Sequence, residues 1–241
     1  MALILNLETA TTVCSVSLAK DGELIALKEI NGDYSHAENL TLFIEDVFKQ
    51  AGIKLNSIDA VAVSKGPGSY TGLRIGVSTA KGLCYSLDKP LIAINTLEHT
   101  AHAVAKEMKR EYTGRLSEIP SLNNALLCPM IDARRMEVYC ALFDRNNKCI
   151  MPTKALIIDG NSFSDYLKEN KIFFFGDGSD KCYNILSELD NVFFFKDIVP
   201  SAENMIPLSE EAFNKKQFED VAYFEPFYLK DFVAGKKKGD I

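Results

Sequence analysis

One order of predicted strands and helices occurs twice along this chain, and no other feature limits its possible folds as strongly. In the first half, hydrophobic periodicity predicts three strands, then a helix, a strand, a helix, a strand and a final helix. The strand segments are 3–8, 13–19, 24–30, 60–64 and 91–94, and the helical segments are 37–51, 70–87 and 96–110. The pair Asp21-Gly22, between the second and third strands, is typical of a tight turn. The first half therefore begins with a β-hairpin.

The same order returns after a polar connector at residues 111–123. Strands are predicted at 125–131, 137–143, 150–158, 172–175 and 192–195, and helices at 161–169, 179–189 and 202–213. Pro207 marks either the true start of the last helix or a kink in it. Two βββαβαβα halves in tandem are typical of a duplicated ribonuclease-H-like unit. We therefore predict an α/β protein with the duplicated actin-like (ASKHA) fold, and two unrelated α/β domains are the alternative.

The predicted domains follow this repeat. Residues 1–110 form the N-terminal lobe, and residues 111–200 form the C-terminal lobe. The C-terminal segment 201–230 is expected to return to the N-terminal lobe and complete it. Residues 231–241 are expected to form a flexible tail.

The composition excludes several functional classes. The net charge of -6 over 241 residues argues against a free-standing nucleic-acid binder, which needs a basic surface. No apolar run reaches the roughly 18 residues that span a membrane. The six cysteines contain no C-x-x-C pair and fall within apolar segments, so we expect them to be reduced. Together these features predict a cytoplasmic protein that does not contact membranes.

A glycine-rich segment follows the strand at 60–64 and leads into the helix at 70–87. It runs from Lys65 to Gly76 as KGPGSYTGLRIG. A strand, a glycine-rich turn and a helix in this order direct backbone N–H groups and the positive helix end at an anion. The segment lacks the Gly-Lys-Ser/Thr ending of a Walker loop, and Gly72 comes one residue too late for the dinucleotide motif G-x-G-x-x-G. An anion site and a simple tight turn are both compatible with this pattern.

The same segment resembles the signature of the bacterial TsaB (YeaZ) family, and the likeness extends over nearly the whole chain. Further matching segments are Ser78–Leu83, Glu8–Thr11, Ser35-His36, Asp132–Arg134, Glu137–Tyr139, Gly176–Gly178, Ser201–Met205 and Pro226–Lys230. The resemblance implies a role in making threonylcarbamoyladenosine (t6A) on tRNA. It also implies that the chain is the non-catalytic scaffold and activator of a larger homologue, TsaD, which holds the metal and transfers the threonylcarbamoyl group.

The resemblance further implies which cofactors and partners to expect. ATP and metal belong to TsaD and to a small ATPase, TsaE, so this chain is expected to have no cofactor and no catalytic residue of its own. TsaD is the expected heterodimer partner, TsaE joins the complex, and tRNA is reached through the complex. A homodimer is expected when TsaD is absent. The tail lysines, Lys236–Lys238, either contact tRNA phosphates or are simply solvated.

The residues themselves give little support for catalysis by this chain alone. His36 lies in His-Ala-Glu, which lacks the second histidine of H-E-x-x-H. His99 and His102 lie three residues apart on a helix without an obvious third ligand, so we predict polar surface histidines and no metal site. No Ser-His-Asp or Cys-His set can be assembled by spacing. A metallo-glycoprotease-like hydrolase, one rival function, is therefore disfavoured.

An autonomous actin-like phosphotransferase is the other rival, and it requires a nucleotide cleft. Actin-like enzymes hold phosphates between two hairpin turns, usually with an aspartate in the first turn. In this chain Glu8 stands there, and the second turn, 132–135, lacks glycine. The turn at 176–179 either accepts a base or ribose, or starts a helix with Ser179 as its N-cap. The residues of this degenerate nucleotide or phosphate site are expected to be Glu8, Thr9, Gly66, Gly68, Ser69, Thr71, Gly72, Asp132, Arg134, Gly176 and Gly178.

The two N-terminal helices are the expected docking surface. The first carries Leu42 outside its apolar stripe, and the second contains Gly72, Gly76 and Gly82, although glycine inside a helix costs up to about 1 kcal/mol relative to alanine. Packing of the helix on its own sheet explains such glycines, and so does pairing with counterpart helices of TsaD, which the resemblance favours. The candidate contact residues, some of which must face the sheet, are His36, Leu40, Phe43, Ile44, Tyr70, Leu73, Arg74 and Val77.

Overall fold

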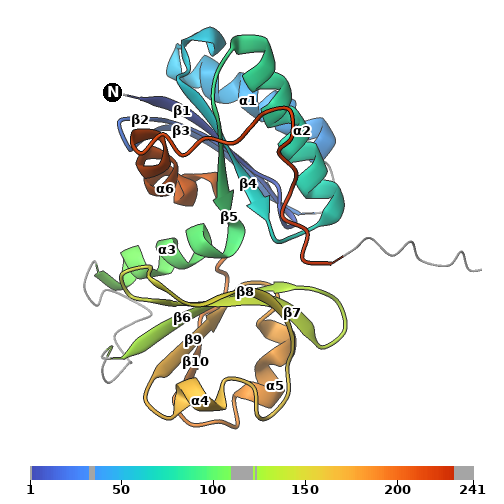
Figure 1. Ribbon diagram of the computed structural model, residues 1–241, viewed down its shortest axis with the longest axis vertical. Helices are drawn as coiled ribbons and strands as arrows, with labels where there is room; N and C mark the ends of the chain where they lie inside the picture. Colours follow the sequence, from blue (N-terminus) through green and yellow to red (C-terminus); the bar gives the residue numbers. More distant parts are fainter. Residues whose placement is uncertain (1, 33–35, 110–121, 123, 231–241) are drawn as a thin grey trace, which may run out of the picture.

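The computed structural model describes residues 2–32, 36–109, 122 and 124–230. It contains two five-stranded mixed sheets, one in each lobe, with helices packed against them (Figure 1). The predicted cap at Ser35, the connector 111–123 apart from Leu122, and the tail 231–241 lie outside the described residues.

The first sheet has the strand order β3-β2-β1-β4-β5. Its strands are β1 (Leu3–Glu8), β2 (Val13–Lys20), β3 (Glu23–Asn31), β4 (Ala60–Gly66) and β5 (Leu91–Asn95). β1 pairs antiparallel with β2 and parallel with β4, so it lies at the centre of the sheet. All six of its residues are buried, as expected for a strand that is covered on both faces.

The second sheet repeats this arrangement with the order β10-β9-β6-β7-β8. Its strands are β6 (Ala125–Asp132), β7 (Glu137–Asp144), β8 (Cys149–Ile157), β9 (Lys171–Phe175) and β10 (Val192–Phe194). β6 pairs antiparallel with β7 and parallel with β9, as β1 does with β2 and β4. The predicted duplicated actin-like α/β fold is thereby confirmed.

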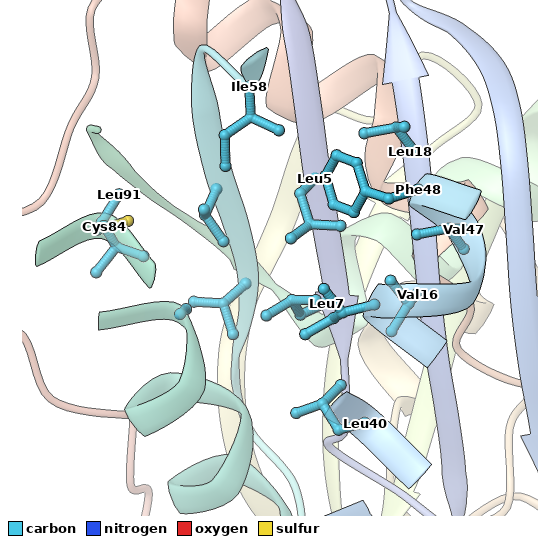
Figure 2. Packing of buried hydrophobic residues seen from close by; sticks show 14 of the residues in the cluster. Leu5, Leu7, Val16, Leu18, Leu40, Val47, Phe48, Ile58, Cys84 and Leu91 are labelled. Carbon is cyan, nitrogen blue, oxygen red and sulfur yellow. The ribbon is translucent and has the colours of Figure 1, made fainter. Parts of the chain in front are cut away.

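Two long helices, α1 (His36–Ala51) and α2 (Tyr70–Leu87), lie side by side on one face of the first sheet. Figure 2 shows Leu40, Val47 and Phe48 of α1 directed at the apolar side chains of β1 and β2. The apolar stripe of α1 is therefore the part of the helix that the sheet buries.

The two sheets exchange one helix each. α3 (Thr96–Lys109) follows β5 of the first sheet, yet its apolar side packs with residues of β6, β7 and β9 (Figure 1). α6 (Ala202–Asn214) follows the second sheet, yet it covers the remaining face of the first. The expected boundary near residue 110 therefore does not follow the core packing, because α3 belongs to the second core. Pro207 lies inside α6, whose N-cap is Ser201.

The helices of the second lobe are shorter than predicted. Only α4 (Ser164–Leu167) forms within 161–169, and only a 3-10 turn followed by α5 (Tyr183–Leu186) forms within 179–189. Before α4, the carboxylate of Asp159 accepts hydrogen bonds from the backbone N of Asn161 and from the Ser162 hydroxyl. Such local bonds hold a turn and compete with the helix.

After α6 the chain runs along α2 to Lys230, and we call residues 217–230 the strap (Figure 1). The strap starts beside β5, where Glu219 N donates to Leu91 O. It continues along α2, where Lys81 Nζ donates to the carbonyls of Ala222 and Phe224 at 3.1 and 2.9 Å. The outer layer of the first lobe therefore has three members, α1, α2 and the strap.

Among the described helices, none combines the length and the apolar character needed to cross a bilayer.

Candidate functional site

A cleft of about 770 Å³ lies between the two lobes. One wall consists of the β1–β2 turn together with the first turns of α1 and α2, and the opposite wall consists of the β6–β7 turn and Asp177. Strap residues 227–230 also line the cleft. The turns that the sequence assigned to a degenerate nucleotide or phosphate site are therefore brought together.

The glycines on the first wall are used for packing within the chain. A Cβ added to Gly68 or Gly72 would lie within 3.0 Å of the carbonyl oxygen of Ala10 or Thr9, and a Cβ on Gly76 would meet the Thr9 hydroxyl. Thr9 Oγ1 also donates to Gly72 O at 2.8 Å. The helix start thus presses on the β1–β2 turn, and Ser69 caps it by accepting from Gly72 N. These contacts account for the glycines without any ligand.

The glycines of the second lobe have a similar role. Gly176 adopts a φ of 94°, and a Cβ there would collide with Met130 O. A Cβ on Gly178 would lie 2.7 Å from the backbone of Ile131. Ser179 is the N-cap residue of the following 3-10 turn, but its side chain does not cap the turn, because its hydroxyl donates to Gly176 O at 2.8 Å. The segment 176–179 is therefore a tight turn at the end of β9.

Glu8 does not point into the cleft. Its side chain is fully buried, with Oε2 lying 2.6 Å from Nε2 of His99 and Oε1 accepting from Ala10 N. The prediction that His99 is a polar surface residue is wrong, because α3 passes between the two sheets at this point and buries the imidazole completely. The carboxyl group of Glu8 is thus hydrogen-bonded to a side chain of α3.

The second turn is held by ion pairs and backbone bonds. Asp132 pairs with Lys181 and accepts a hydrogen bond from Arg134 N at 2.6 Å. Arg134 and Arg135 adopt φ values of 71° and 52°, a left-handed conformation that side chains with a Cβ rarely adopt. Arg134 lines the cleft, and burial raises the pKa of Tyr139 nearby.

Asp177 closes the base of this wall. Its carboxylate accepts a hydrogen bond from the backbone N of Asp132, and burial raises the pKa of the Asp177 carboxyl.

Two remaining predicted residues, Ser69 and Thr71, line the cleft on the first wall. Gly66 does not line the cleft, and its α-carbon faces Leu73 and Phe227 O.

The described residues hold no group of three histidine, cysteine or carboxylate side chains in an arrangement that fits a metal ion. His36 is half-buried at the cleft rim, with Nε2 lying 2.8 Å from Thr11 O. His102 is half-buried on α3. Neither histidine joins the Glu8–His99 pair as a ligand set.

Four of the eight predicted docking residues face the core instead. Leu40, Ile44, Leu73 and Val77 are buried in the cluster between the two helices and the first sheet. These positions form the apolar stripes of α1 and α2, and both stripes are buried against the first sheet. These four are therefore the candidates that face the sheet, and their side chains are not exposed to a partner. His36, Phe43 and Tyr70 are half-buried, and Arg74 is exposed.

The surface left open on α1, α2 and the strap, which we call the outer face, carries different residues. Leu42 is 56% exposed, Tyr85 is 87% exposed and Tyr223 is 83% exposed. A Cβ on Gly82 would meet no atom within 4 Å. The outer face comprises Leu42, Arg74, Ser78, Gly82, Tyr85 and Tyr223. Tyr85 is not among the residues predicted to contact a partner, although its spacing from Ser78 and Gly82 places all three on one side of a helix.

Three side chains join the outer face to the cleft. The guanidinium carbon of Arg74 lies 4.2 Å from the ring centroid of Tyr70, and Arg74 Nε donates to the Tyr228 hydroxyl at 3.3 Å. The rings of Tyr70 and Tyr228 have centroids 5.0 Å apart. Because Tyr70 and Tyr228 also line the cleft, this cluster lies at its mouth.

A protein-family model described as "TsaD: tRNA N6-adenosine threonylcarbamoyltransferase" matches residues 33–238 of the chain. The chain belongs to this family. Within the family it groups with the TsaB proteins. It is 29% identical to the "tRNA threonylcarbamoyladenosine biosynthesis protein TsaB" of Escherichia coli (strain K12), over 97% of both chains.

The TsaD-type members of the family match over a shorter stretch. The tRNA N6-adenosine threonylcarbamoyltransferase of Clostridium perfringens is 46% identical over 63 residues, which cover 26% of this chain and 19% of that protein. Among solved structures, YeaZ from Pseudomonas aeruginosa superimposes with a TM-score of 0.76 at 22% identity, covering 95% of this chain and 100% of that one. The TsaB relatives thus match this chain in length as well as in fold, and their names assign those proteins to tRNA threonylcarbamoyladenosine biosynthesis.

Proposed function

We propose that this chain is the non-catalytic scaffold and activator subunit of a bacterial t6A synthesis complex, and that it pairs with the catalytic homologue TsaD through its outer face. The observation that carries this function is the exposed apolar surface of α1 and α2, with Leu42 and Tyr85 turned away from their own core. Large aromatic side chains exposed to this degree are typical anchors of protein interfaces.

The shared ancestry with transferases supports a homologous partner. A partner built on the same repeat has helices equivalent to α1 and α2, so two similar faces can meet in a pseudo-symmetric four-helix contact. Gly82 favours such a contact, because an exposed glycine in a helix lets a second backbone approach closely. The same surface serves self-association when TsaD is absent.

The cleft supports a non-catalytic role. Glu8 is bound to His99, Asp132 is bound to Lys181, and the glycines of both walls contact their own backbone. An actin-like phosphotransferase needs such groups free to hold phosphate and metal. We assign ATP and metal to TsaD and TsaE, and we expect tRNA to bind to the assembled complex.

Reconstitution tests the function directly. TsaD, TsaE, ATP, a threonylcarbamoyl donor and tRNA are combined with and without this chain, and t6A is measured by mass spectrometry. We expect t6A formation to depend on this chain, and we expect the chain alone not to hydrolyse ATP. Rapid ATP turnover by the isolated chain would favour the phosphotransferase alternative instead.

A docking variant tests the surface. Leu42→Glu with Tyr85→Asp places two charges on the outer face without touching the core, so the chain should fold normally but lose co-purification with TsaD. The matched control is Ile157→Glu, which changes a side chain that is 69% exposed on β8 of the other lobe. TsaD binding that survives the double substitution would remove the outer face as the docking surface.

A further inference from the structure

The two ends of the cleft are held by contacts of different kinds. At the hinge end, Glu8 of β1 and His99 of α3 are both completely buried. Next to them, the hydroxyls of Ser64 and Thr96 lie 2.7 Å apart. Asn95 Nδ2 also donates to Thr153 on β8 at 3.2 Å. The hinge end is therefore dry and closely bonded.

At the mouth, the strap crosses from one lobe to the other. Phe227 N donates to Lys65 O at 2.7 Å, and the ring of Tyr228 packs at a tilt against that of Tyr70, so this part of the strap is fixed to the first lobe. Two residues later, Lys230 forms an ion pair with Glu137 of β7 in the second lobe. These two side chains are 40% and 23% exposed. The mouth is therefore bridged by a contact that water and salt can reach.

We propose that the strap is an interlobe latch, in which the Lys230–Glu137 ion pair sets how far the cleft opens around the buried Glu8–His99 hinge. Exposed ion pairs are weak and are screened by salt, whereas buried pairs are screened much less. Breaking the latch thus lets the lobes part at the mouth while the hinge stays intact.

The latch is also placed to respond to a partner. Arg74 belongs to the outer face and bonds to Tyr228, which lies two residues before Lys230. A protein that binds the outer face therefore contacts the anchor of the strap, and we infer that it biases the strap toward its closed position. This last step rests on the proposed docking function, whereas the latch itself does not.

Distance measurement by electron paramagnetic resonance tests the latch in the full-length chain. Spin labels are placed at Gln50→Cys on α1 and Ser187→Cys beyond α5, in a Cys149→Ser background that removes the exposed native thiol. Labelled protein is diluted with unlabelled protein so that distances between copies do not contribute. The variants are Lys230→Ala, Glu137→Gln and the charge swap Lys230→Glu with Glu137→Lys. Lys215→Ala is the matched control, because its ion pair with Glu211 joins α6 only to the residue that directly follows the helix.

We expect each single variant to raise the population at longer distance roughly two- to five-fold, the range that a surface ion pair supports. The charge swap should restore the original distribution. Raising the ionic strength from about 0.05 to about 0.5 M should open the unsubstituted protein and leave Lys230→Ala unchanged. Single variants with unaltered distances at both ionic strengths would overturn the latch.

A second arm adds TsaD and separates the two proposals. A narrower, shorter distance distribution supports coupling between the outer face and the strap. If Lys230→Ala opens the isolated chain but TsaD binds without changing the distances, the latch holds and the coupling is wrong. If TsaD does not bind at all, the proposed docking fails while the measurement on the isolated chain still decides the latch.

Discussion

At the scale of single residues, the Glu8–His99 pair is the contact that the sequence could not reveal. Both residues were singled out, Glu8 for its place in the first turn and His99 for its spacing from His102. Their meeting joins positions 91 residues apart, and helical spacing carries no information about such a partner. The same limit applies to Asp132 and Lys181. By contrast, six of the eleven predicted cleft residues do line the cleft, because turns at strand ends bring them to its walls.

The first prediction concerns this pair. His99→Ala leaves a buried carboxylate without its partner, and we expect the free energy of unfolding to fall by about 3–5 kcal/mol. Urea unfolding followed by circular dichroism measures the change. Lys168→Ala is the control, because it removes an exposed ion pair with Asp165 and should change stability by about 0.5 kcal/mol or less. A loss below about 1 kcal/mol for His99→Ala would mean that the pair contributes little to the hinge.

At the scale of elements, α2 shows where the sequence succeeds and where it stops. Its predicted bounds, 70–87, are those of the structure, since the glycine-rich turn and the apolar period define both ends. The three glycines were noticed together, but they divide into two kinds. Gly72 and Gly76 press on Thr9, and Gly82 faces open space. The two kinds of glycine differ only in whether the β1–β2 turn packs against them, and the sequence does not reveal that contact. For α4 and α5 the predicted helices were too long. There, local turn hydrogen bonds replace part of the helix that the apolar pattern predicts.

The second prediction uses this division. Gly76→Ala forces a methyl group against the Thr9 side chain and should destabilise the protein by about 1–3 kcal/mol. Gly82→Ala meets nothing and should stabilise it by about 0.5–1 kcal/mol. Thermal unfolding of the two variants side by side measures both signs. Equal effects would contradict the assignment of the two glycines to different roles.

At the scale of the whole molecule, the repeat was predictable and the exchange of helices was not. The order of elements fixes two similar sheets, because each half reads the same way along the chain. An amphipathic helix shows that it needs an apolar surface but not which of two sheets supplies it. α3 and α6 therefore could not be assigned to their cores from the sequence, and the lobe boundary near residue 110 does not match the core packing.

The third prediction follows from the exchange. A fragment of residues 1–110 lacks α6, so Ile4, Ala62 and Ile92 lose their cover, and we expect it not to fold cooperatively. The full-length chain should instead unfold in one calorimetric transition, because each core contains a helix from the other half. Two separate transitions in the intact protein, or a folded 1–110 fragment with sharp methyl resonances, would contradict this expectation.

The buried imidazole of His99 also limits what the chain can become. Shortening Glu8 to aspartate would restore the side chain usual in actin-like enzymes, but it would pull the carboxylate away from His99 and strand that ring in a dry interior. A second change on α3 would have to come first or at the same time. Any route to phosphate chemistry through Glu8 thus passes through a less stable intermediate, because His99 is fully buried and loses its partner.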